Sequence, residues 1–139
     1  MINIIISSDP RYRVNRFAIR SAVLQSLKSH GILGRVESGI NIVGQRKIHE
    51  LNRQYRGIDA TTDILSFALE DPNPSYLQHI PRVGFVAAPD RMLRLGDIVI
   101  SYSQALDDAV MDGISVDEEI VYLVEHGLSH LLGIHHSEN

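Results

Sequence analysis

Near its C-terminus the chain contains the stretch His126-Gly-Leu-Ser-His130-Leu-Leu-Gly133-Ile-His135-His136. His126 and His130 are four positions apart, so on a helix their imidazoles leave the same face one turn from each other and can bind one ion. Gly133 permits a left-handed helix end, after which the chain can turn back and bring a third imidazole, from His135 or His136, toward that ion. Three neutral imidazoles with an open fourth position are the ligand set of catalytic zinc.

The histidines complete an apolar helix that begins near residue 115. Ser115-Val-Asp-Glu118 has the form of a capping box, in which the Ser hydroxyl and the Glu carboxylate each bind a backbone N–H of the first turn. Apolar residues up to position 132 cover so much of the circumference that the helix should be largely buried. We therefore place the predicted metal site on the last long helix and the turn after it, with the rest of the chain as scaffold.

The remaining segments show strand and helix periodicities in turn. The pattern predicts strands at 2–7, 35–43, 63–69 and 96–101, a further strand around 83–87, and helices at 14–30, 45–55 and 103–111. In the helix at 45–55 we expect Ile48, Leu51 and Tyr55 to face inward. This order predicts an α+β fold with a single small mixed sheet covered by helices, and the length predicts one domain over residues 1–139.

The composition is that of an ordinary globular protein, with 44% hydrophobic and 22% charged residues. No cysteine is present, which excludes disulfides and thiolate metal sites. No apolar run reaches the roughly 18 residues that a membrane span needs. We expect a cytoplasmic protein with no membrane partner and no nucleotide cofactor.

The net charge of −4 is divided unevenly between the two parts of the chain. Residues 1–56 hold ten Lys and Arg against three Asp and Glu, whereas residues 57–139 hold three against fourteen. Such asymmetry is typical of a protein with one basic face for a polyanion, although solvated helix surfaces produce the same pattern.

The histidine spacing also matches the H-x-x-x-H-x-x-G-x-x-H frame of one class of zinc proteases. Those enzymes carry Glu after the first ligand as the general base, and here that position is Gly127. Glu125 leaves the helix about 100° away from His126 and cannot simply take over that role. Peptide hydrolysis is therefore disfavoured, while a reaction with an anionic phosphoryl transition state stays open if a fixed cation assists.

Three segments together resemble the YbeY family of bacterial endoribonucleases, also described as rRNA maturation factors. They are Leu51-Asn-Arg-Gln-Tyr-Arg56 through Thr62-Asp-Ile-Leu-Ser-Phe67, then Leu95-Gly-Asp-Ile-Val-Ile-Ser101, then the histidine stretch. With the spacing between them they cover residues 51–136. The last family motif has aspartate where this chain has His135, which adds another imidazole beside the third ligand position.

The resemblance implies one Zn²⁺ ion held by His126, His130 and His136, with Arg56 as the catalytic residue. It also implies single-stranded RNA, ribosomal RNA in particular, as substrate, and ribosomal proteins as further candidate partners. A guanidinium is always charged and can bind two phosphoryl oxygens at once, which suits this role for Arg56. We also expect the helices bearing Arg13, Arg16, Arg20, Arg46, Lys47 and Arg53 to form a groove for the RNA backbone.

The leading hypothesis is thus a metal-dependent, single-strand-specific endoribonuclease acting in ribosomal RNA maturation and ribosome biogenesis. An alternative is a zinc-stabilised RNA- or ribosome-binding maturation factor with little intrinsic cleavage. A zinc peptidase is the third hypothesis, and Gly127 weakens it.

Overall fold

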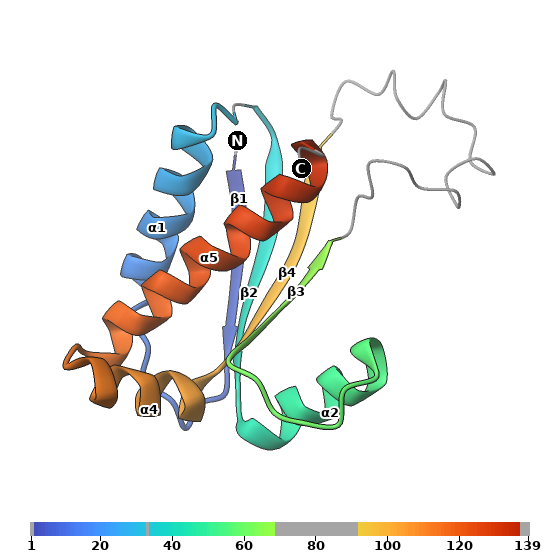
Figure 1. Cartoon of the computed structure of the whole chain (residues 1–139). Helices are drawn as coiled ribbons and strands as arrows, with labels where there is room; N and C mark the ends of the chain where they lie inside the picture. The colour runs from blue at the N-terminus through green and yellow to red at the C-terminus, as the bar shows by residue number, and fades with distance from the viewer. Residues whose placement is uncertain (1, 33, 69–91, 137–139) are drawn as a thin grey trace.

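The computed structural model describes residues 2–32, 34–68 and 92–136, the last three of them as backbone only. Its elements are β1 (Ile2–Ser8), α1 (Arg16–Ser29), β2 (Val36–Val43), α2 (Gln45–Arg56), β3 (Ile64–Ala68), β4 (Leu93–Ser101), α4 (Tyr102–Asp112) and α5 (Val116–His136). The predicted α+β class is confirmed, because these helices accompany a single mixed sheet (Figure 1). The strand predicted around 83–87 lies outside the described residues.

The four strands form one sheet in the order β1-β2-β4-β3. β1 pairs parallel with β2 and β2 pairs parallel with β4, whereas β3 runs antiparallel to β4. β3 is therefore an edge strand of the described sheet. The candidate site lies at this edge.

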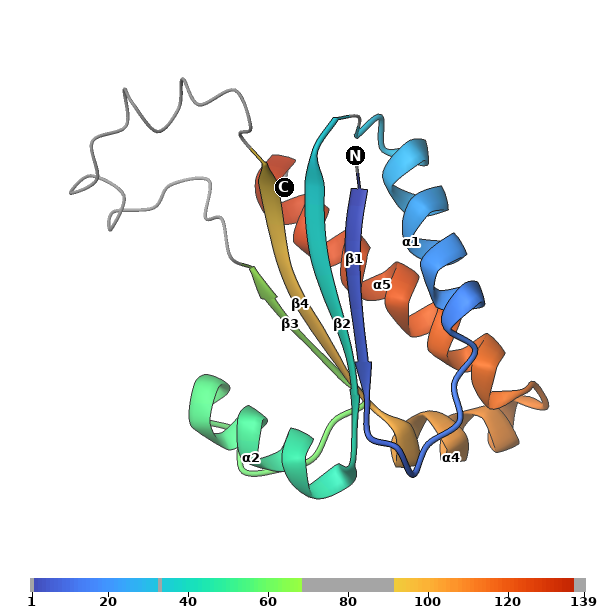
Figure 2. The ribbon, with the colours of Figure 1, turned by 180° about the vertical axis from the view of Figure 1, so that it is seen from behind.

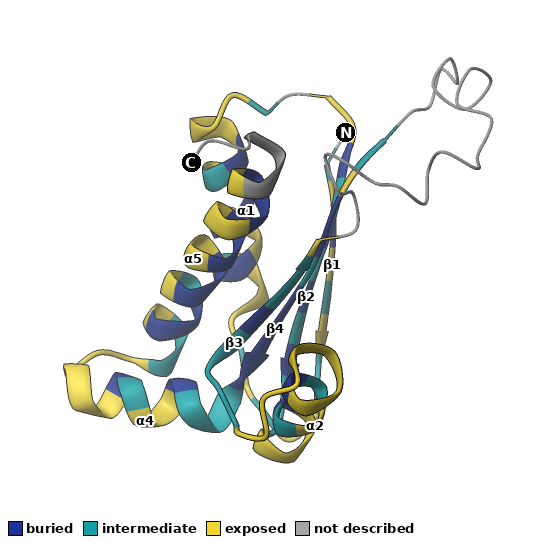
Figure 3. Cartoon of the chain, turned by 45° about the vertical axis from the view of Figure 1, so that its right-hand side comes forward, coloured by how far each residue is buried: buried dark blue, intermediate teal, exposed yellow. Residues whose placement is uncertain are grey.

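The two faces of the sheet are covered unequally. α1 and α5 pack on one face, and α2 lies on the opposite one (Figures 2 and 3). Side chains of β2 alternate between the two faces of the sheet, and those on one face contribute to the larger core. Val36, Ile40 and Ile42 are each at most 1% exposed and face α1 and α5. On the α2 side, a smaller cluster joins Ile48 to Leu65 and other residues of the sheet. The predicted sheet covered by helices is confirmed, with one face more open than the other.

The predicted capping box at the start of α5 is confirmed. The Ser115 N–H donates to Glu118 Oε1 at 2.9 Å and the Glu118 N–H donates to Ser115 Oγ at 3.1 Å, so the capping box forms. α2 and α4 end at Gly57 and Gly113, whose φ angles of 71° and 72° are left-handed and favour glycine.

Two predictions for the helices are wrong. Tyr55 does not face inward, because its side chain is 63% exposed. α5 does not end at Gly133 but continues to His136, so the predicted turn before the third histidine does not form. A glycine permits a left-handed stop without requiring one, and the buried Leu131 and Leu132 hold the last turns of α5 against the core. None of the described helices is long and apolar enough to cross a membrane.

Candidate active site at the edge of the sheet

A cleft of about 340 Å³ lies where α5 passes the edge strand β3. It is lined by Arg56 from the end of α2, by Ile64, Leu65 and Ser66 from β3, and by His126 and His130 from α5. The edge position explains how both helices reach one cleft although they cover opposite faces of the sheet. The structure thus brings together three of the residues that the sequence nominated: Arg56 and the first two histidines.

The two histidines present their ring nitrogens to each other. His126 Nε2 and His130 Nε2 are 3.2 Å apart, and both side chains are exposed. Two nitrogen ligands of one tetrahedral zinc ion, each at 2.0–2.1 Å, stand about 3.3 Å apart. The spacing of the pair therefore fits two ligands of one ion. Tyr122, one turn earlier, stacks on His126 with the ring centroids 6.3 Å apart, which limits the orientations open to that ring.

Gly127 sets how closely α5 approaches the sheet. A Cβ at this position would lie 3.0 Å from the Cδ1 atoms of both Ile64 and Ile98. A larger side chain at position 127 would therefore push the helix off β3 and β4. In the zinc-protease frame, Gly127 stands only for a missing general base. In this structure Gly127 has a packing role, because its side of the helix faces the apolar core.

Arg56 is the last residue of α2 and is exposed. It forms no ion pair with any of the described residues, so its guanidinium is not committed to a carboxylate of the scaffold. Gly57 turns the chain immediately afterwards and ends the helix beside β3. A guanidinium that lines the same cleft as two imidazoles, and has no ion pair among the described residues, is suited to binding an anionic group.

Comparison with known proteins places this geometry in a family. The family model described as Endoribonuclease YbeY matches residues 7–139. The chain belongs to the endoribonuclease YbeY family. The resemblance predicted from the sequence is thereby confirmed, and with it the predicted enzyme class, a hydrolase acting on RNA.

Relatives in the YbeY family match almost the whole chain. An endoribonuclease YbeY of Dehalococcoides mccartyi is 37% identical over 137 residues, which are 99% of this chain and 78% of that protein. One of Roseiflexus castenholzii is 39% identical over 129 residues, covering 91% and 75%. A solution structure of a Thermotoga maritima protein has a TM-score of 0.59 at 22% identity, with coverage of 98% and 77%, and shows a similar fold.

The third ligand position of the YbeY motif lies on the continued helix. A helix rises 1.5 Å per residue, so the backbone of His136 is about 15 Å along the axis from that of His126. Among the side chains that the structure describes, no three His, Cys, Asp or Glu gather closely enough to hold a metal ion. His136 as a ligand stays a prediction, and it requires the helix to open after Gly133.

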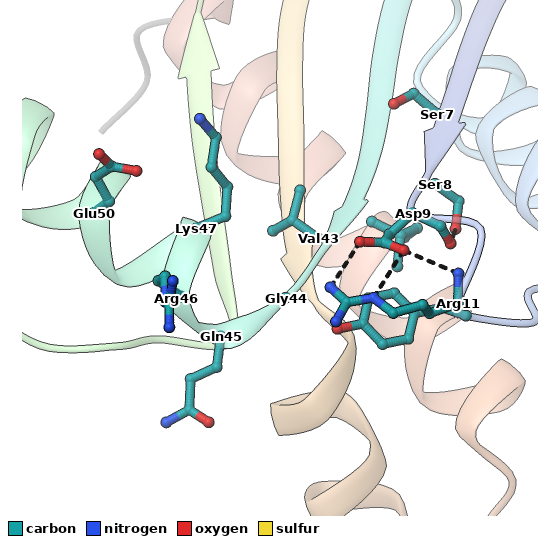
Figure 4. Close-up of a pocket in the computed structure, with 12 residues that line it drawn as sticks. Ser7, Ser8, Asp9, Arg11, Val43, Gly44, Gln45, Arg46, Lys47 and Glu50 are labelled. Carbon is teal, nitrogen blue, oxygen red and sulfur yellow. Dashed lines mark hydrogen bonds and ion pairs between the residues drawn. The ribbon is translucent and has the colours of Figure 1, made fainter.

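A larger cleft of about 780 Å³ lies at the ends of β1 and β2, beside the first turn of α2 (Figure 4). Arg11 donates to Asp9 through its backbone N–H, Nε and Nη2, at 2.8 to 3.0 Å. The side-chain hydrogen bonds from Arg11 are the main reason why the pKa of Asp9 falls to about 2. Arg46 and Lys47 also line this cleft, which contains none of the candidate catalytic residues.

The single RNA groove expected between the basic helices does not form. α1 and α2 lie on opposite faces of the sheet, so the arginines of α1 are separated from Arg46 and Lys47 (Figure 1). Arg16 of α1 donates to the Ile6 carbonyl at 2.8 Å and so serves to attach α1 to β1. Helix periodicity in the sequence shows which residues share a helix face, but it does not show on which side of a sheet each helix packs.

Proposed function

We propose that this YbeY-family chain is a metal-dependent endoribonuclease that cleaves single-stranded RNA during ribosomal RNA maturation. The observation that supports the proposal is the shared cleft at the edge of the sheet, which is lined by Arg56 and by the His126–His130 pair. Family membership supplies the reaction class, and the cleft supplies a cation and a metal-ligand pair for it.

The side chains present fit zinc at two positions. His126 and His130 would hold the ion, and the predicted third ligand, His136, would join them if metal binding opens the end of α5. A zinc ion bound there would polarise a phosphoryl oxygen and ionise a bound water. The lining of the cleft contains no carboxylate, so the described residues offer no general base of the protease type.

Arg56 would bind the scissile phosphate. A guanidinium donates to two oxygens at once and keeps its charge throughout the reaction, so it stabilises the extra negative charge that the phosphorane gains. Its position at an exposed helix end, next to an edge strand, leaves the cleft accessible to a chain that enters from solvent. An unpaired strand can bend into such a cleft, whereas a stiff duplex presents its phosphates on a broad surface.

Ribosomal RNA is the proposed natural substrate, ribosomal proteins are the proposed partners, and the cytoplasm is the proposed location. The substrate and the partners come from the family resemblance, and the basic N-terminal part of the chain supports an RNA substrate. The location comes from a sequence with no cysteine and no apolar run long enough for a membrane span.

Cleavage assays with matched RNAs test the proposal. We expect the zinc-loaded protein to cut a single-stranded rRNA fragment, to leave the same sequence in a duplex intact, and to lose activity when zinc is removed. His130→Ala should lose both the zinc and the cleavage. His30→Ala is the matched control, because this exposed histidine at the end of α1 only hydrogen-bonds the Ser26 carbonyl. Equal cleavage by metal-free protein or by His130→Ala would overturn the metal-dependent mechanism.

A further inference from the structure

A second cleft beside the edge strand β3, of about 450 Å³, lies on the more open face of the sheet. Its lining includes Asn41, Lys47, Leu51, Tyr55, Phe67 and Asp97. Tyr55 lines this cleft and Arg56 lines the histidine cleft, so the end of α2 borders both. On β3, Phe67 lines this cleft and Ser66 lines the histidine cleft. Consecutive side chains of a strand point to opposite faces, so the two clefts lie on either side of this edge strand, and an RNA strand that passes around the edge would reach both.

An aromatic pair forms one side of this second cleft. The rings of Tyr55 and Phe67 meet edge to face, with the centroids 5.5 Å apart. Tyr55 is 63% exposed, so part of its ring is open to solvent and to a ligand. Exposed aromatic rings beside a path for single-stranded RNA act as stacking platforms for bases. The outward position of Tyr55, which the sequence did not predict, therefore suits a ring that stacks on a base.

Polar groups on the floor of the cleft are available to a ligand. The Asp97 carboxylate forms no hydrogen bond or ion pair with any of the described residues. It lies over Gly39, where a Cβ would collide with its Oδ1 atom. Asn41 Nδ2 donates to the Ile98 carbonyl at 3.4 Å, which leaves its Oδ1 free to accept. The floor thus offers the Asp97 carboxylate and the Asn41 amide oxygen as acceptors, next to one remaining N–H of the Asn41 amide.

Lys47 supplies a cation at the rim. Its side chain is exposed and extends along the face of the strands, away from Arg11 (Figure 4). It lies where an RNA backbone leaving the second cleft could be bound. The aromatic side suits a stacked base, the acceptors on the floor suit the edge of that base, and the cation at the rim suits a phosphate.

We propose that this second cleft binds one base of the RNA strand, next to the phosphate held by Arg56, and that Asp97 makes guanine the preferred base. A carboxylate accepts hydrogen bonds only, and guanine presents N1–H and N2–H₂ side by side on its Watson–Crick edge. Uracil presents one N–H between two carbonyl oxygens, which repel the carboxylate. This inference rests on the proposed function, because it assumes that RNA is the ligand of the histidine cleft.

Binding without cleavage tests this subsite separately from the reaction. The His130→Ala variant serves as the host, so that the RNA stays intact, and the probes are the single-stranded tetranucleotides UUGU, UUAU, UUCU and UUUU. We expect UUGU to bind tightest, with NMR shifts centred on Asn41, Asp97 and Val99. Adding Tyr55→Ala should weaken UUGU binding by roughly 10-fold, since one stacked base contributes 1–3 kcal/mol. Phe17→Ala removes another exposed ring, on α1, and should change nothing.

Asp97→Asn tests the base preference. The amide replaces one acceptor oxygen with a donor, so binding of UUGU should fall to the level of UUAU while UUUU binding is unchanged or improved. Equal binding of all four probes, or full binding by the Tyr55→Ala variant, would overturn the subsite even if zinc-dependent cleavage is observed. Guanine-selective binding by a protein that never cleaves RNA would retain the subsite and overturn the proposed function instead.

Discussion

Gly127 shows how a single residue can combine fold and function. Its position in the zinc-protease frame calls for a catalytic glutamate, yet here even a Cβ at this position would lie 3.0 Å from the Cδ1 atoms of Ile64 and Ile98. A carboxylate could not occupy this space and also reach a metal ion on the exposed side, where His126 and His130 lie. The sequence disfavours a protease mechanism because Gly127 replaces the glutamate. The packing of α5 supports that conclusion.

Gly127→Glu should unfold or severely destabilise the protein. The new side chain both overpacks the contact with the sheet and buries an unpaired carboxylate, so we expect a loss of at least about 3 kcal/mol in unfolding free energy. Ser129→Glu puts the same group on the exposed face of the same helix and should change stability by no more than about 0.5 kcal/mol. Denaturant unfolding of both variants checks this. Similar stabilities would show that the helix does not pack on β3 through Gly127.

Glu119 is a buried acid whose charge destabilises the fold. It is 6% exposed, and its pKa is raised above the ordinary 4.5, first by burial and then by the nearby charges of Asp108, Asp112 and Asp63. The folded state therefore binds the proton more tightly than the unfolded state, so this residue makes stability fall as pH rises from 4.5 through the folded pKa.

Glu119→Gln should accordingly be more stable than the wild type at pH 7. The difference should shrink as pH is lowered and vanish below about 4.5, where Glu119 is protonated in both states. Unfolding midpoints measured from pH 4 to pH 8 follow this difference. Glu125→Gln, an exposed neighbour on α5, is the control and should show no such trend. A Glu119→Gln variant less stable than the wild type at pH 7 would contradict the assignment of an unfavourable buried charge.

The element that the sequence described least well is the end of α5. Its start was predictable because a capping box is a local signal, and the glycine stops of α2 and α4 are local as well. The end depends on tertiary packing, since Leu131 and Leu132 are buried and keep the chain helical beyond Gly133. Local patterns thus located the elements, while packing determined where the last helix ends.

Gly133→Ala distinguishes a continuing helix from a left-handed stop. Nothing lies within 4 Å of a Cβ at this position, and its φ is not left-handed. Alanine should therefore stabilise the metal-free protein by up to about 1 kcal/mol, through helix propensity. If the helix instead ended at Gly133 in a left-handed turn, alanine would destabilise the protein by a similar amount. The unfolding temperatures of the wild type and of Gly133→Ala, both measured in the presence of a chelator, distinguish the two cases.

The arrangement of the whole molecule was the part least accessible from sequence. The strand order β1-β2-β4-β3 places α1 and α2 on opposite faces, and no periodicity in the chain encodes that order. Of the candidate site, the histidine pair could be predicted from spacing, whereas Arg56 came from the family resemblance. The structure adds the physical reason for their meeting: both helices pass the edge of one short strand.

The central claim is that Arg56 and a histidine-bound metal act on the same phosphodiester. The most direct measurement is the cleavage rate of a single-stranded rRNA fragment by Arg56→Ala, together with zinc content by elemental analysis. We predict a wild-type zinc content and a rate at least about 100-fold lower, as for the loss of one charge-stabilising donor. Arg53→Ala, in the same last turn of α2, should retain the rate. Cleavage by zinc-loaded Arg56→Ala at the wild-type rate would contradict the claim.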